Sequence, residues 1–169
     1  MKRILFPFAL IIILVQSCQS PVQKNALNYN NKIANISKIN KDKWKEVGME
    51  ISAAGESHEF SKLIKLANDL IDFLKNKISE VNAMKNPAGS EDLKNAMLEF
   101  LKFQKRTADE TLTPYTQMNH ETTSEEFQSA TLALVEAAKN EEPYLVKLQD
   151  AQRDFAKRNG FKLQENKEQ

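Results

Sequence analysis

Residues 60–81 constrain the fold of this chain most strongly, because apolar side chains recur there at every third or fourth position. The stripe consists of Phe60, Leu63, Ile64, Ala67, Leu70, Ile71, Leu74, Ile78 and Val81. Lysines and acids occupy the opposite face of a helix with 3.6 residues per turn. A helix of this kind buries its apolar face against other helices, so the segment predicts a helical bundle.

A similar stripe before this segment predicts a first helix over roughly 26–54. Its apolar positions are Tyr29, Ile33, Ile36, Trp44, Val47 and Ile51. Gly55 is expected to supply the left-handed stop of this helix, and Ser57 to cap the helix that follows.

Two more stripes follow the turn predicted at residues 86–89, which contain Pro87 and Gly89. Ser90 is the expected N-cap of the third helix, and Pro114 should kink that helix near its end. Its apolar face consists of Leu93, Met97, Phe100, Leu101, Ala108, Leu112, Tyr115 and Met118.

The fourth helix is expected to begin at a capping box from Thr123 to Glu126, to be interrupted by Pro143 and to end at Gly160. Nowhere do β-branched residues form the alternating runs typical of strands. The predicted fold class is therefore all-α. Residues 26–161 should form an up-down-up-down antiparallel four-helix bundle, and residues 162–169 a flexible tail.

Three polar residues interrupt the apolar stripes. Asn40 and Gln104 are expected to share a layer of the bundle, where a polar pair more often fixes helix register than binds a ligand. Glu141 either turns to solvent at the Pro143 kink, which we favour, or forms a buried pair with Lys105 or Arg106.

The start of the chain has the pattern of a secretion signal. Lys2 and Arg3 precede an apolar run over residues 4–15, and the only cysteine, Cys18, follows three residues later. A run of this length falls short of the ~20 residues that span a bilayer. A transmembrane anchor and a signal peptide cut elsewhere remain the alternatives.

The segment Val15-Gln16-Ser17-Cys18 resembles the lipobox of signal peptidase II substrates, with Val15, Ser17 and Cys18 matching and Gln16 a looser fit. The resemblance implies that residues 1–17 are removed and that Cys18 carries diacylglycerol and an N-acyl chain such as palmitate. Two or three chains make attachment to a membrane effectively permanent. No other cofactor is expected.

Residues 18–25 are expected to form a polar tether between this lipid and the bundle. Gln19 differs from the aspartate that favours inner-membrane retention in similar lipoproteins, which implies the outer membrane. The pattern leaves open whether the protein faces the periplasm or the cell surface.

The rest of the chain resembles small, all-helical bacterial surface lipoproteins of spirochaetes and Bacteroidetes, whose biochemical function is unassigned. The resemblance rests on Tyr29-Asn30, on residues 100–115, and on Gln152, Phe155, Ala156, Asn159 and Phe161. It implies a helical lipoprotein and carries no catalytic residues.

Charge and cysteine content exclude several classes of function. The chain has 24 basic and 23 acidic residues, so without Lys2 and Arg3 it is close to neutral and has no net field to attract nucleic acid. If Cys18 is lipidated, no thiol is left for a disulfide, a metal site or a nucleophile.

Few residues offer site chemistry. His58 and His120 should lie at the same end of the bundle beside Glu59 and Glu121, a set that could bind a divalent metal, although exposed helix-end histidines are the simpler interpretation. Neither histidine has the Glu-x-x-His or His-x-x-x-His spacing of helical metal sites.

Two hypotheses for function follow. In the first, a lipid-anchored, non-enzymatic module binds another envelope or host protein, with Phe73 and Phe103 projecting off the stripes as a contact patch. In the second, the bundle binds a small ligand or a divalent metal in the periplasm. No nucleophile with a base and an orienting group is discernible, so no reaction is expected.

Overall fold

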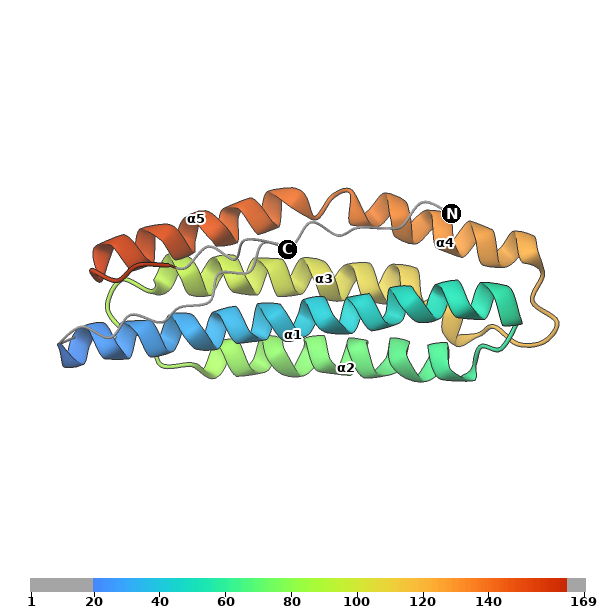
Figure 1. Cartoon of the computed structure of the whole chain (residues 1–169), viewed down its shortest axis with the longest axis horizontal. Coiled ribbons are helices and arrows are strands. Elements are labelled where there is room, and N and C mark those ends of the chain that lie inside the picture. Colours follow the sequence, from blue (N-terminus) through green and yellow to red (C-terminus); the bar gives the residue numbers. More distant parts are fainter. Residues whose placement is uncertain (1–19, 164–169) are drawn as a thin grey trace.

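The computed structural model describes residues 20–163, and these contain helices and no strand. The helices are α1 (Pro21–Ser57), α2 (Ser61–Ala83), α3 (Glu91–Thr116), α4 (Ser124–Ala138) and α5 (Glu142–Arg158) (Figure 1). The prediction of an all-α chain is confirmed for this range. The predicted signal peptide and most of the predicted tail lie outside the described residues.

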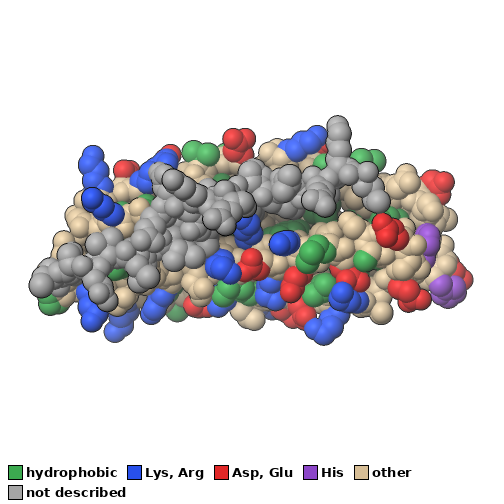
Figure 2. Space-filling model, in the orientation of Figure 1, with side chains coloured by type: hydrophobic (Ala, Val, Ile, Leu, Met, Phe, Trp, Pro, Cys, Tyr) green, Lys and Arg blue, Asp and Glu red, His purple; other side chains and the backbone are tan. Residues whose placement is uncertain are grey.

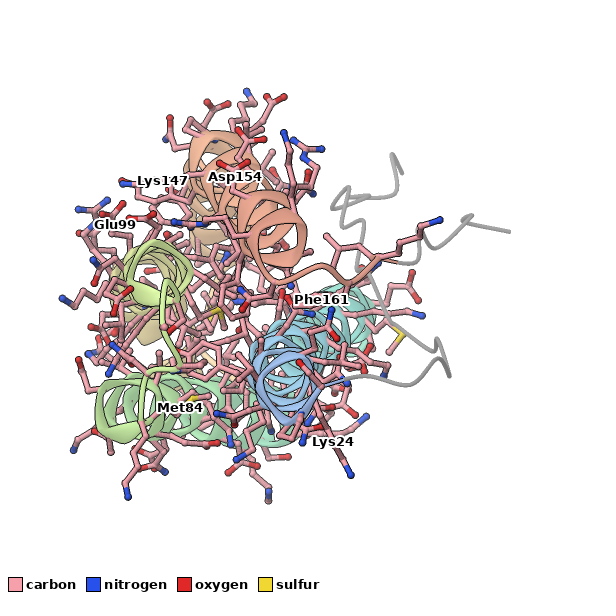
Figure 3. All side chains as sticks on the ribbon, turned by 90° about the vertical axis from the view of Figure 1, so that its left-hand side faces the viewer. Lys24, Met84, Glu99, Lys147, Asp154 and Phe161 are labelled. Atoms are coloured by element: carbon pink, nitrogen blue, oxygen red, sulfur yellow. The ribbon has the colours of Figure 1, made fainter. Side chains whose placement is uncertain are left out.

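The helices lie side by side in a long, narrow bundle (Figure 1). The helix α3 packs against α2, α4 and α5, and α1 packs against α2, α4 and α5. The Nζ of Lys147 in α5 lies 2.5 Å from a carboxylate oxygen of Glu99 in α3, and both residues are labelled in Figure 3. The start of α1 and the end of α5 lie at one end of the molecule, and the connections 58–60 and 117–123 lie at the other (Figure 1).

The first helix begins at Pro21, five residues earlier than the sequence predicts. Ser20 is its N-cap: the Ser20 Oγ accepts a hydrogen bond from the backbone N–H of Gln23 at 3.2 Å, and the Gln23 side chain accepts one from the Ser20 N–H at 3.0 Å. Proline suits the first position of a helix because its missing N–H would have no partner there. Residues 21–25, expected to belong to a tether, are therefore helical.

The end of α1 also differs from the prediction. The helix continues through Gly55 to Ser57, and His58 takes the left-handed conformation with a φ of 56°. A Cβ at Gly55 would lie 2.6 Å from Cε1 of Phe127, so this glycine permits a close approach to α4. The N-cap position of α2 is Phe60, not Ser57, and has no side-chain capping bond.

The predicted fourth helix is two helices, separated at residues 139–141. Asn140 and Glu141 make turn-type bonds back to Ala137 and Ala138, at 3.1 and 3.2 Å. Pro143 stands in the first turn of α5, where a proline can begin a helix without losing a hydrogen bond. The proline thus lies in the first turn of a new helix, where the sequence predicts an interruption of one helix.

The remaining boundaries agree closely with the sequence. Gly89 has a φ of 73° in the turn before α3, and the capping box of Thr123 and Glu126 begins α4. Ser90 occupies the N-cap position of α3 but makes no side-chain capping bond. The helix α3 continues past Pro114 for two residues.

The apolar stripes meet in one continuous core. The largest fully buried side chains are Tyr115, Phe100, Phe155, Ile33, Leu63, Leu70, Leu74, Leu93, Met97, Leu101, Leu112 and Val47. Every buried residue of this core lies between Ala26 and Phe161. The chain from Ser20 onward therefore contains the whole apolar core of the described residues.

Candidate functional site

The carboxyl group of Glu141 is the one acid buried in the described part of the bundle. Its side chain is 4% exposed at the break between α4 and α5. Gln104, on the inner face of α3, donates a hydrogen bond from its Nε2 to the Glu141 Oε1. The pair thus joins α3 to the beginning of α5.

Burial raises the pKa of Glu141 from its ordinary value of 4.5 to about 7, and the hydrogen bond from Gln104 opposes this shift only in part. The site therefore takes up or releases a proton near neutral pH.

The prediction that Glu141 turns to solvent is wrong, and so are the two partners named for its buried form. Lys105 pairs with Asp109 at 2.5 Å, and the Arg106 guanidinium lies 5.8 Å from the centre of the Phe103 ring. Sequence reasoning identified Gln104 and Glu141 separately but missed that they meet. The signal was that each interrupts an apolar stripe.

A small cavity of about 10 Å³ lies beside this pair. It is lined by Trp44, Phe103, Gln104, Thr107, Leu134, Ala138 and Glu141. A volume of this size has room for about one water molecule. The cavity thus leaves no space for an organic ligand beside Glu141.

Two buried asparagines of α1, Asn40 and Asn30, differ in their hydrogen bonding. Asn40 is fully buried, and within the described chain neither its Oδ1 nor its Nδ2 has a hydrogen-bond partner. Gln104, its expected partner, is bonded to Glu141 instead. Asn30 of α1 accepts a hydrogen bond at 3.3 Å from the Nε2 of Gln152 in α5.

These two asparagines give a matched pair of tests. Asn40→Leu should raise the free energy of unfolding by about 1–2 kcal/mol, because a buried amide without hydrogen bonds is replaced by an apolar group of similar size. Asn30→Leu should lower it by about 1 kcal/mol, since Gln152 loses its acceptor, a cost that removal of the unpaired Asn30 Nδ2 offsets only in part. Urea denaturation of both variants measures the difference. Destabilisation by Asn40→Leu as large as that by Asn30→Leu would contradict the expectation.

The two histidines lie at the same end of the bundle (Figure 2). The ring of His58 meets the edge of Phe60, with centroids 6.5 Å apart, and Glu59 is exposed beside it. The His120 side chain is 90% exposed, with its Nε2 4.0 Å from a carboxylate oxygen of Glu121. Over residues 20–163 no three His, Cys, Asp or Glu side chains group so that they could hold a metal.

The predicted contact patch of Phe73 and Phe103 is not present as expected. Phe103 is buried and stacks on Tyr144 of α5, with ring centroids 4.4 Å apart. It is covered because α3 packs against α5 as well as against α2, so a residue off its main stripe also faces a helix. Phe73 is half-buried on α2, with the Nζ atoms of Lys43 and Lys77 at 5.4 and 5.7 Å from its ring centre.

Val15, Ser17 and Cys18, the residues of the predicted lipidation signal, lie outside the described residues. Between residues 20 and 163, none of the helices combines the length and apolar character that crossing a bilayer requires.

Within residues 20–163, the fold and the site together define an all-helical bundle with one buried carboxyl group. Comparisons with models of protein families, with curated proteins and with solved structures find no significant match to this chain.

Proposed function

We propose that this chain is a lipid-anchored lipoprotein of the cell envelope and acts as a non-enzymatic interaction module. Diacylglycerol and an N-acyl chain on Cys18 would hold it at the outer membrane. Its helices would form an up-down-up-down antiparallel four-helix bundle in which α4 and α5 together make the fourth column. The bundle would bind another envelope or host protein.

The start of α1 is the observation that carries this proposal. Its N-cap, Ser20, is only two residues after Cys18 and is tied into the helix by its capping box. Two residues of extended chain reach at most ~7 Å. A lipid on Cys18 would therefore hold the first turn of α1 beside the bilayer.

The length of α1 then determines what the module presents to a partner. Its 37 residues make a helix of about 55 Å at 1.5 Å per residue. If the first turn of α1 lies at the membrane and the helix points away from the bilayer, the connections 58–60 and 117–123 lie farthest from the membrane. These connections, with His58 and His120, are the surfaces that a partner would meet first.

Lipidation is tested in bacteria that express the full chain, the Cys18→Ser variant and a Gln16→Ala control, which keeps the three matching positions. We expect the wild type and the control in the membrane fraction. Mass spectrometry of their first peptide should show an acylated Cys18 without residues 1–17. The Cys18→Ser variant should keep its leader and carry no lipid. An unmodified Cys18 in the wild-type protein would refute the anchor.

The interaction is tested in the same cells with a photo-crosslinking amino acid at Glu59 or Glu121, and with Lys85 at the opposite end as the control position. A discrete adduct with an envelope protein should form from the first two positions and not from Lys85. Equal labelling from all three positions, or no adduct from any, would count against an interaction module.

A further inference from the structure

The charges of the bundle are separated along its length. The proximal end, defined as residues 20–32, 84–94 and 150–163, holds the start of α1, the α2–α3 connection and the end of α5 (Figure 1). Its basic residues outnumber its acidic residues eight to four. They are Lys24, Lys32, Lys85, Lys94, Arg153, Lys157, Arg158 and Lys162, against Glu91, Asp92, Asp150 and Asp154.

The opposite end has the opposite charge. The distal end, defined as residues 46–65 and 109–128, has nine acidic residues and two basic ones. The acids are Glu46, Glu50, Glu56, Glu59, Asp109, Glu110, Glu121, Glu125 and Glu126, and the bases are Lys62 and Lys65. Figure 2 shows acidic side chains beside the histidines at this end and basic side chains at the other. A chain with a formal net charge of only +1 therefore has a strong separation of charge between its two ends.

Several cations of the proximal end are already engaged. Arg158 pairs with Asp92 at 3.2 Å, and Arg153 pairs with Asp150. Lys94 donates hydrogen bonds to the backbone oxygens of Asn82 and Met84 at the end of α2, at 2.8 and 3.0 Å.

Five lysines of the proximal end are exposed and have no ion pair among the described residues. They are Lys24, Lys32, Lys85, Lys157 and Lys162. Lys24 projects outward from α1 in the view onto this end (Figure 3). The helix α1 has no acidic residue before Asp42, so Lys24 and Lys32 have no carboxylate neighbour on their own helix.

We propose that the proximal end rests on the bilayer and binds anionic lipid headgroups through these exposed lysines. The inference rests on the proposed anchor, because a lipid on Cys18 is what would turn this end toward the membrane. Each lysine near an anionic surface raises the affinity of the protein for that membrane by about fivefold.

The acidic end does not cancel this attraction. Salt screens charges over about 8 Å at physiological ionic strength, whereas α1 alone extends about 55 Å between the two ends. Lysines at the membrane would lie within one screening length of the headgroups, whereas the distal acids would lie several screening lengths away. Charge separation, and not net charge, thus gives the bundle its affinity and its orientation.

Vesicle binding of the chain from Gln19 to Gln169 tests this without the lipid, since that chain contains the whole described core. Vesicles of phosphatidylcholine alone, or with phosphatidylglycerol added, are sedimented with the protein at low and high salt. The test variant carries Lys24→Gln, Lys85→Gln and Lys157→Gln. The matched control carries Lys45→Gln, Lys75→Gln and Lys102→Gln, which are exposed lysines outside the proximal end.

We expect binding to the anionic vesicles only, and loss of that binding at high salt. The proximal triple variant should bind more weakly by about fivefold per lysine removed, while the control changes little. Thermal denaturation followed by circular dichroism verifies that all three proteins are folded. Binding to both lipids alike, no binding to either, or equal weakening by the two triple variants would overturn the proposal.

The two proposals fail separately. Vesicle binding does not depend on processing at Cys18, so an unmodified cysteine in cells would refute the anchor and leave the vesicle result unchanged. Conversely, an acylated Cys18 with no preference for anionic vesicles would refute only the role of the proximal lysines.

Discussion

Replacing Glu141 by Gln should raise the free energy of unfolding at pH 8 by about 3 kcal/mol. In the folded chain the pKa of this buried carboxyl is raised to about 7, whereas the unfolded chain has the ordinary value of 4.5. The protonated carboxyl stabilises the fold fully below pH 4.5. This contribution falls as the pH rises toward 7, and above that pH it is lost. A glutamine carries no charge at any pH and can still bond to Gln104.

Urea denaturation at pH 4.5, 6 and 8 measures this effect. The difference in free energy of unfolding between Glu141→Gln and the wild type should be smallest at pH 4.5 and should grow until about pH 7. Because other carboxyl groups titrate equally in both proteins, the difference isolates Glu141. Glu142→Gln, at the exposed neighbouring position, is the control and should show no such growth. Parallel pH profiles for the Glu141 variant and the wild type would contradict the buried carboxyl.

Phe155→Ala should lower the free energy of unfolding by about 3–5 kcal/mol, the largest loss that we expect from a single substitution. Phe155 is fully buried on α5, and its ring meets the edges of Tyr29 at 6.0 Å and Phe161 at 5.9 Å between centroids. Removing the ring would leave a cavity where α5 packs against α1.

Phe73→Ala is the matched control for this prediction, because it removes the same ring from a half-buried position on α2. Its cost should be less than half that of Phe155→Ala. Thermal and urea denaturation of both variants provide the comparison. Equal losses at the two positions would mean that the core does not close around Phe155.

The helical class of the fold could be predicted because one period repeats along the chain. The stripe of residues 60–81 places Leu63, Leu70 and Leu74 in the core, where the structure has them. Such a pattern is local, since each helix buries the residues that share its face. Contacts between helices are not local. Gly55 lies inside α1 with Phe127 of α4 against it, and nothing near Gly55 in the sequence announces that contact.

The candidate site shows the same limit. Gln104 and Glu141 are 37 residues apart, on different helices. Periodicity indicates that each points inward, but not that they point at each other. The position of Phe103 was predicted wrongly for a related reason: a single stripe assumes one buried face, and α3 packs against α5 as well as against α2.

The start of α1 at Pro21 has a consequence for how far the module reaches. A lipoprotein domain on a long flexible linker can reach partners within a wide volume above its membrane. Here a lipid on Cys18 would be joined to α1 by a linker shorter than the diameter of a single helix with its side chains. The bundle would then move only by tilting about its proximal end, and a partner of the distal end would have to lie about one bundle length from the membrane.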